Sequence, residues 1–159
     1  MELNFLAAVR CVRRAVPPLR NENGHLVLIG SLASKTASKY IGPYAATKFA
    51  LASYAQQLRL ELQDPPIHVL HVCPGPIARD DAGNRYDEEA ANLPPEARKA
   101  GGGVGLRAIA PDQLAQRILT GCEKRQLEIV VPWKARILFA VSQLSAEWGD
   151  WLFRKQSKS

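Results

Sequence analysis

The sequence predicts an α/β fold in which helices cover a parallel sheet. Three short apolar runs read as strands, and the first is continuous rather than alternating, which is typical of a strand buried on both faces. Stretches with apolar residues at helical spacing lie between these runs. Because helices and strands alternate along the chain, the strands are expected to be parallel. The predicted strands are Leu26 to Ile29, Ile67 to Val72 and Leu127 to Val131.

Length and composition fit one globular domain. The chain has 159 residues, 47% of them hydrophobic, which is enough to bury a core. The net charge is +6, but the basic residues are scattered and no aromatic-studded strand or recognition helix accompanies them, so no nucleic acid is predicted as a partner. No signal peptide and no apolar run long enough to span a membrane is found. We therefore expect a cytoplasmic protein.

The first helix is expected to cover residues 2 to about 19, where apolar residues recur close to helical period. Pro17 and Pro18 are expected to end it. A chain that begins inside an amphipathic helix lacks the cap or the preceding strand of a complete α/β domain. We therefore expect that a segment upstream of Met1 is missing.

The most informative stretch joins the first strand to the second helix. Ser31 follows the strand directly, and Pro43 then opens a helix that begins with Tyr44 and carries Lys48 one turn later. Residues four apart on a helix share a face, so these two side chains project side by side. A nearby ammonium favours the ionised form of a phenol, whose ordinary pKa is about 10. The stretch therefore predicts a phenol that can exchange protons.

An ordered set of residues resembles the short-chain dehydrogenase/reductase family. The set consists of Asn4 in the first helix, Ser31, the Tyr44-x-x-x-Lys48 pair and Pro74-Gly75 after the second strand. A lone Tyr-x-x-x-Lys pair would be weak evidence, but the four features in order are specific. The resemblance covers residues 1 to about 132. It implies a partial Rossmann-like doubly wound sheet, made of the last three strands and their helices, without the Gly-rich N-terminal turn that binds the cofactor.

The resemblance implies hydride exchange between NAD or NADP and a carbonyl or alcohol carbon. Tyr44 would be the acid/base, Ser31 would hydrogen-bond the reacting oxygen, and Lys48 would favour the phenolate and hold the nicotinamide ribose. Asn4 would hold a water that passes protons to Lys48. The implied cofactor contacts are Tyr44, Lys48, Pro74, Gly75 and Ile77.

The chain departs from the family pattern at two positions. Arg79 stands where the pattern usually has a threonine that contacts the cofactor, and Ser34 stands where glycine is frequent. The residue that would distinguish NAD from NADP lies upstream in the family. Neither the choice of cofactor nor the substrate is therefore predicted.

No metal site is predicted. The three cysteines, Cys11, Cys73 and Cys122, are widely spaced in apolar surroundings, which indicates a reducing compartment rather than a disulfide framework. His68 and His71 are interpreted as structural, because neither has a catalytic or metal partner in view. Asp80 and Asp81 are expected to form a solvated turn. The glycine run at 101–105 is interpreted as a hinge in the long segment 78–110, since no strand precedes it.

Residues 133–159 are predicted to form an amphipathic helix and a basic tail after the domain at 1–132. Its apolar stripe is expected to pack on the domain or on a partner subunit. A wall of the substrate channel and a peripheral membrane contact through 134–155 are the alternatives. The stripe consists of Ile137, Val141, Leu144, Trp148, Trp151 and Leu152.

Two functions remain open from the sequence. The first is an oxidoreductase that acts on a small carbonyl or alcohol substrate and is a homo-oligomer in its complete form. The second is a non-catalytic, truncated domain of the same fold that serves subunit or membrane association, since the cofactor-binding half is not in these 159 residues. On this basis the chain alone is expected to be poorly soluble and to bind no NAD(P)H.

Overall fold

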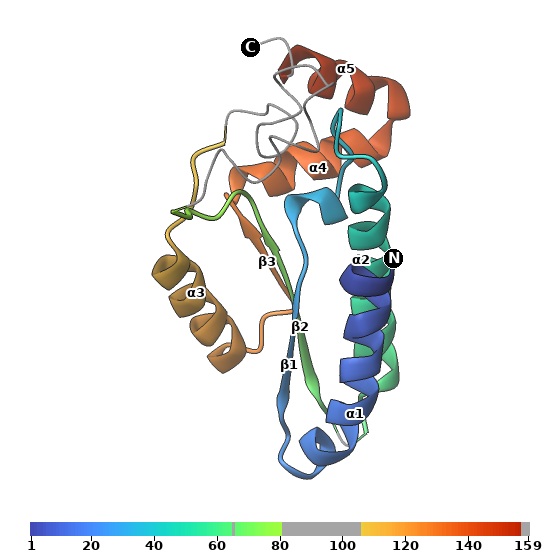
Figure 1. Cartoon of the computed structure of the whole chain (residues 1–159), viewed down its shortest axis with the longest axis vertical. Coiled ribbons are helices and arrows are strands. Elements are labelled where there is room, and N and C mark those ends of the chain that lie inside the picture. The colour runs from blue at the N-terminus through green and yellow to red at the C-terminus, as the bar shows by residue number, and fades with distance from the viewer. Residues whose placement is uncertain (65, 81–105, 157–159) are drawn as a thin grey trace.

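A three-stranded parallel sheet forms the centre of the molecule, which is described by a computed structural model over residues 1–64, 66–80 and 106–156. The strands are β1 (His25–Ile29), β2 (His68–Pro74) and β3 (Glu128–Val131), and they lie in the order β1-β2-β3 (Figure 1). Their register places His25 beside His68 and His71 beside Glu128. The parallel sheet that the sequence predicted is confirmed.

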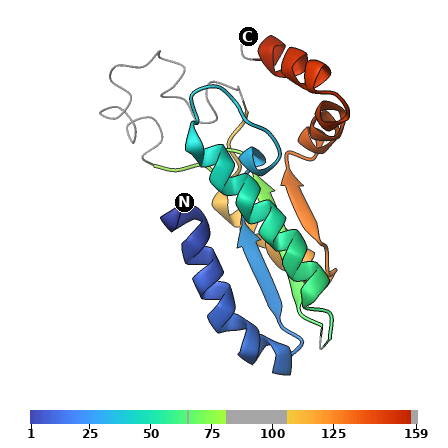
Figure 2. The same ribbon diagram turned by 90° about the vertical axis from the view of Figure 1, so that its right-hand side faces the viewer.

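Helices cover both faces of the sheet. Helices α1 (Ala7–Asn21) and α2 (Pro43–Glu61) lie on one face, and α3 (Pro111–Glu123) lies on the other (Figures 1 and 2). Every residue of β2 is buried, because this strand has a neighbour on each side and helices on both faces. The doubly wound arrangement follows from this pattern of burial.

Two apolar clusters fill the space between the sheet and its helices. On the side of α1 and α2, Val12, Leu51 and Ala55 pack against Val69 of the central strand. On the other side, Leu114 of α3 packs in one cluster with Leu70 and Val72 of β2 and with Ile129 and Val131 of β3.

The N-terminal helix passes through its two prolines, so the expectation that Pro17 and Pro18 end it is wrong. A π-helical turn, η1 (Glu2–Leu6), leads into α1, and the helix continues to Asn21. Each proline costs the helix one backbone donor. Val16 and Leu19, which flank the prolines, pack against the apolar core and hold this last turn in place.

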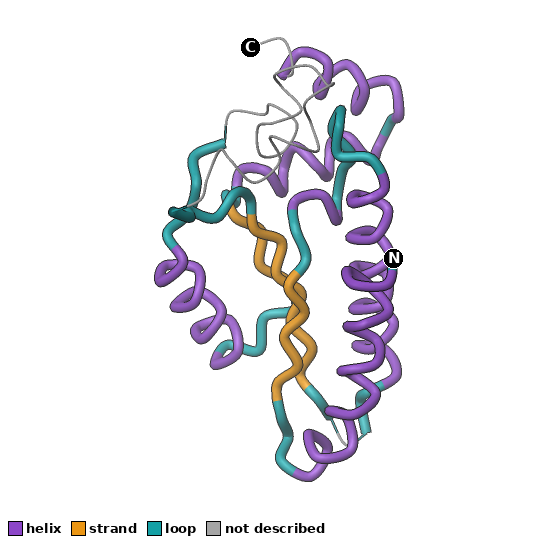
Figure 3. The backbone as a smooth tube through the Cα atoms, in the orientation of Figure 1, coloured by secondary structure: helices purple, strands orange, loops and turns teal. Residues whose placement is uncertain are grey.

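The predicted single C-terminal helix is in fact two helices. Helix α4 (Lys134–Leu144) ends at Ser145, whose backbone is extended (φ −150°, ψ 129°), and α5 (Ala146–Gln156) begins after it (Figure 3). The two helices pack closely at Gly149, where an added Cβ would lie 2.8 Å from the carbonyl oxygen of Ser142. The turn at Ser145 lets Phe153 pack on the same cluster as Phe139, which one straight helix could not achieve.

The other element boundaries agree with the sequence to within a few residues. Strand β2 extends through Cys73 and Pro74, which were expected to begin the following loop. Asp81 and the glycine run at 101–105 lie outside the described residues. Within the part of the chain that the structure describes, no helix combines the length and the hydrophobicity needed to cross a bilayer.

Candidate active site

Ser31 stands directly beyond β1, at the carboxyl edge of the sheet. It is the N-cap of a short 3-10 helix, η2 (Leu32–Ser34), and its Oγ accepts a hydrogen bond from the N–H of Ala33 at 3.2 Å. In return, the N–H of Ser31 donates to Oγ of Ser34 at 3.2 Å. This reciprocal capping fixes Ser31. It also gives a structural role to Ser34, which the sequence marked only as a departure from glycine.

Tyr44 and Lys48 lie together on the first turns of α2. Gly42 precedes the helix with φ +47°, a conformation that favours glycine, and Thr47 Oγ1 donates to the carbonyl oxygen of Tyr44 at 2.7 Å. The Nζ of Lys48 lies 5.7 Å from the centre of the Tyr44 ring. Since the Tyr44 side chain is 40% exposed, the pair faces open space at this edge of the sheet.

Lys48 also connects the helix to the strand. Its Nζ donates to the carbonyl oxygen of Ile29, the last residue of β1, at 3.2 Å. Burial lowers the pKa of the Lys48 ammonium, and the nearby Cys73 opposes that shift. Strand β1 therefore positions Ser31 at its end and also binds the ammonium of Lys48 through its last carbonyl.

Asn4 reaches the same region from the N-terminal turn. It lies on η1 and lines a cavity of about 330 Å³ between α1 and β1. Lys48 lines the same cavity, together with Ile29. The structure therefore brings Asn4 and Lys48 to one cavity, which has room for water.

The loop after β2 is held by backbone hydrogen bonds to β3 and to Ile109. The N–H of Gly75 donates to the carbonyl oxygen of Val131 at 2.8 Å, which holds the chain after Pro74 against β3. Ile77 lies opposite Ile109 in a parallel bridge. The N–H of Ile109 donates to the carbonyl oxygen of Pro76, and the N–H of Ala78 donates to the carbonyl oxygen of Ile109. The N–H and carbonyl of Ile77 itself therefore point away from Ile109.

A closed polar cluster beneath this site was missed by the sequence reasoning. It consists of His71, Cys73, Glu128 and Lys35: Lys35 Nζ lies 2.6 Å from Glu128 Oε1, and His71 Nδ1 lies 3.6 Å from the same oxygen. The contact with His71, and then the ion pair with Lys35, hold the pKa of Glu128 near 2 against the opposing effect of burial. Burial raises the pKa of the Cys73 thiol to about 12. The register of β2 and β3 places His71 beside Glu128, and Lys35 reaches them from the end of η2.

Sequence comparison finds that the chain is similar to short-chain dehydrogenases. The sequence profile of the short chain dehydrogenase family matches residues 1–90. A probable short-chain type dehydrogenase/reductase of Helicobacter pylori is 29% identical over 96% of the chain and 60% of its own length. A hydroxysteroid 11-beta-dehydrogenase 1-like protein of Xenopus tropicalis is 26% identical over 98% of the chain and 50% of its own length. The chain thus spans half to three fifths of these curated relatives.

Solved structures share the fold. A short chain dehydrogenase from Burkholderia cenocepacia, in complex with NADP, superposes with a TM-score of 0.72 and 20% sequence identity. The similarity covers 96% of the chain and 56% of that structure. At this level of identity the likeness concerns the arrangement of helices and strands.

Proposed function

Because the chain belongs to the short-chain dehydrogenase family, we propose that it is the catalytic part of an oxidoreductase. The reaction is the transfer of a hydride between a nicotinamide cofactor and a carbonyl or alcohol carbon. The observation that carries the proposal is the half-buried ammonium of Lys48, which is bonded to Ile29 beside the ring of Tyr44. The similar protein of Burkholderia cenocepacia holds NADP, which supports a nicotinamide cofactor.

Each side chain of the site has a separate task in this proposal. In reduction, Tyr44 gives its hydroxyl proton to the carbonyl oxygen, and in oxidation the phenolate takes the proton of the alcohol. Lys48 stabilises the phenolate through its positive charge. Ser31 donates a hydrogen bond to the reacting oxygen, since its own oxygen already accepts from Ala33. Asn4 holds a water in the shared cavity that returns protons to Lys48.

The residues at the carboxyl edge fit a nicotinamide ring. When bound, the cofactor supplies or accepts the hydride. The outward N–H and carbonyl of Ile77 match a carboxamide, which carries both an acceptor and a donor. Lys48 and Tyr44 would hold the ribose, and Pro74 and Gly75 would lie against the ring.

The first test replaces the phenol. In the full-length protein, Tyr44→Phe is expected to lower kcat by about 10²- to 10⁴-fold, because the proton donor is lost. NADPH oxidation would be followed by absorbance with a panel of ketones, and cofactor affinity is expected to fall far less than kcat, because Lys48 still holds the ribose. Tyr40→Phe is the matched control, since Tyr40 is also exposed and lies outside the site. Ordinary turnover in Tyr44→Phe would refute the assignment.

The second test separates the two tasks of Lys48. Lys48→Met is expected to lower kcat and to weaken cofactor binding together, because one ammonium serves both the phenol and the ribose. Lys39→Met, an exposed lysine in the loop before α2, provides the control. If cofactor affinity is unchanged in Lys48→Met, the ribose contact is removed from the proposal.

A second function, peripheral membrane contact through 134–155, is favoured by the surface of α4 and α5. The apolar residues of this surface are largely exposed: Trp133 63%, Ile137 58%, Leu144 79%, Trp148 61% and Trp151 60%. The exposed basic side chains Lys134, Arg136 and Arg154 lie on the same two helices. Tryptophan beside basic residues is the composition of helices that lie in the interface of anionic membranes.

Sedimentation with vesicles tests this surface. The protein is expected to bind phosphatidylglycerol vesicles better than phosphatidylcholine vesicles, and Trp148→Gln should reduce binding severalfold. Trp133→Gln, at the start of α4, tests whether vesicle binding depends on this tryptophan as strongly as on Trp148. A vesicle-independent dimer that Trp148→Gln dissociates would instead assign the surface to subunit contact.

A further inference from the structure

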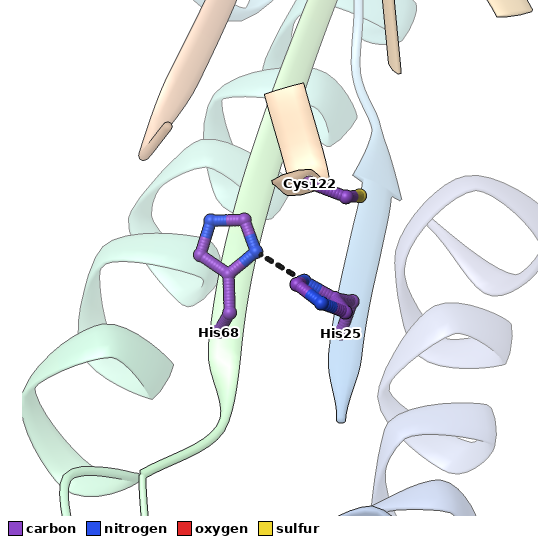
Figure 4. A group of neighbouring side chains, drawn as sticks. All are labelled: His25, His68 and Cys122. Atoms are coloured by element: carbon purple, nitrogen blue, oxygen red, sulfur yellow. Dashed lines mark hydrogen bonds between the residues drawn. The ribbon is translucent and has the colours of Figure 1, made fainter. Parts of the chain in front are cut away.

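A second group of side chains with ligand character lies at the opposite, amino-terminal edge of the sheet. His25 is the first residue of β1, His68 is the first residue of β2, and Cys122 lies in the last turn of α3. The three side chains are neighbours (Figure 4), and their ligand atoms are all within 4.8 Å of one another. None of them takes part in the proposed chemistry at the carboxyl edge.

The hydrogen bonds of His68 determine which of its nitrogens is free to bind. Its Nε2 lies 2.7 Å from the carbonyl oxygen of Gln126. A carbonyl only accepts, so Nε2 carries the proton and donates it. In the neutral ring, Nδ1 then presents its lone pair, and this lone pair faces Nδ1 of His25 at 2.8 Å. Burial lowers the pKa of His68, which keeps the ring neutral.

This arrangement is the usual one for a metal-binding histidine. Such a residue typically donates its other ring N–H to a backbone carbonyl or a carboxylate, which fixes both the tautomer and the direction of the ring. Gln126 provides that carbonyl for His68. The ring is thus held, before any metal arrives, with its lone pair directed at the space that His25 and Cys122 share.

From this geometry we propose that His25, His68 and Cys122 form a binding site for a zinc-class divalent cation. Two imidazole nitrogens and one thiolate suit Zn²⁺, whereas Mg²⁺ and Ca²⁺ require oxygen ligands. A tetrahedral ion completes its coordination with a water molecule at the open side, where His25 is exposed.

Binding is a balanced exchange of ligands and protons. The thiol proton of Cys122 is released to solvent as the metal–sulfur bond forms. His25 moves its proton from Nδ1 to the other ring nitrogen, so that both Nδ1 atoms bind the metal without a further change in charge. Burial raises the pKa of Cys122, so that the thiol is neutral before the metal displaces its proton.

The two rings must separate slightly on binding. Bonds of 2.0–2.1 Å in a tetrahedral site place two nitrogens roughly 3.3 Å apart, against the 2.8 Å between the two Nδ1 atoms. His25 can make this adjustment because it is exposed and lies at the start of its strand. The charges nearby oppose each other, since Arg125 acts on His68 and Glu123 acts on Cys122.

Cobalt provides a spectroscopic test on tag-free protein. One equivalent of Co²⁺ is expected to produce the visible bands of a tetrahedral site and a thiolate-to-cobalt charge-transfer band, and Zn²⁺ should displace both. Cys122→Ser should remove the charge-transfer band, whereas Cys11→Ser, on exposed α1, should retain it. If Cys73→Ser removes the band and Cys122→Ser does not, the metal binds at the closed cluster and the proposal is wrong.

A second measurement does not depend on a variant that alters the interior. Zn²⁺ is expected to protect Cys122 from alkylation, detected by mass spectrometry, while the labelling of Cys11 stays unchanged. His25→Gln changes an exposed residue, and it should weaken zinc binding by about tenfold or more, since loss of even an outer-shell partner costs 10- to 100-fold. Equal protection in His25→Gln and the unchanged protein would overturn the three-ligand site.

Discussion

Two groups of histidine and cysteine lie on opposite faces of β2, and they differ in what their polar atoms already bind. Successive side chains of a strand alternate, so His71 and Cys73 lie on the face of β2 that carries Val69, while His68 lies on the face that carries Leu70 and Val72. In the first group Lys35 already neutralises Glu128 at 2.6 Å. In the second group a fixed lone pair of His68 faces the exposed His25. The same residue types thus form a group whose charges are already paired in one place and a group that could still bind a metal in the other.

The comparison shows that ligand types alone do not identify a site. An internal cation competes with any metal for the carboxylate of Glu128, and a thiol with a pKa of about 12 resists the loss of its proton. The two groups should therefore differ in the reactivity of their thiols, in their tolerance of an added methyl group and in the pH dependence of their stability.

The reactivity of the cysteines is expected to separate the groups most strongly. The pKa of Cys73 is about 12 against an ordinary 9.0, which lowers its reactive thiolate by about 10³-fold. Alkylation of the native protein with iodoacetamide, followed by mass spectrometry, should label Cys11 first, Cys122 more slowly and Cys73 only on unfolding. Rapid labelling of Cys73 under native conditions would mean that the closed group opens to solvent.

Gly30→Ala is expected to damage the closed group selectively. An added Cβ would lie 2.3 Å from Nε2 of His71 and 2.8 Å from Oγ of Ser34, both of them buried. Overpacking of this kind costs about 1–3 kcal/mol, and we expect the upper end because backbone also lies close by. Urea unfolding measures the loss.

Gly75→Ala provides the control for that substitution, since the nearest atom to its added Cβ is 3.3 Å away. It should cost less than about 1 kcal/mol. Equal losses in the two variants would mean that the tight contact with His71 does not determine stability.

The pH dependence of stability should reveal the ion pair of the closed group. The pKa of Glu128 is lowered from 4.5 to about 2, so its contribution is complete above pH 4.5 and is lost as the pH falls from 4.5 towards 2. At pH 7, Glu128→Gln is expected to cost on the order of 2 kcal/mol, reduced from the full shift because the pair is partly exposed.

The difference in unfolding free energy between the protein and Glu128→Gln should therefore shrink in acid. Urea titrations between pH 7 and pH 3 measure it. Glu123→Gln, an exposed residue of α3, is the control and should show little change. A difference that stays constant down to pH 3 would show that Glu128 is not held ionised by its partners.

Local rules account for where the proposed site residues lie on their helix and strand. Tyr44 and Lys48 lie four residues apart on one helix, and Ser31 follows a strand directly, so helix and strand geometry placed them without knowledge of the rest. The turn at Ser145 could not be predicted in this way. The apolar stripe runs through it without a glycine or a proline at that point, and contacts of Phe139 and Phe153 with the domain decide it.

The amino edge depends on register, which local rules do not provide. His25 and His68 meet because both are the first residues of neighbouring parallel strands, and Cys122 joins them from a helix much later in the chain. A signal was present, since two predicted strands each had a histidine at or next to their first residue. Its meaning required the pairing of the strands, and that pairing depends on the whole sheet.

The close contact between α4 and α5 also determines how their exposed surface behaves. Rotation of α5 about its own axis would bring a larger side chain to the place of Gly149, against the carbonyl oxygen of Ser142. Even a Cβ added to Gly149 would lie only 2.8 Å from that oxygen. This contact opposes rotation of α5 against α4. The same packing holds Trp148 and Trp151 at the surface, so a partner or a membrane could contact them without a rearrangement of the two helices.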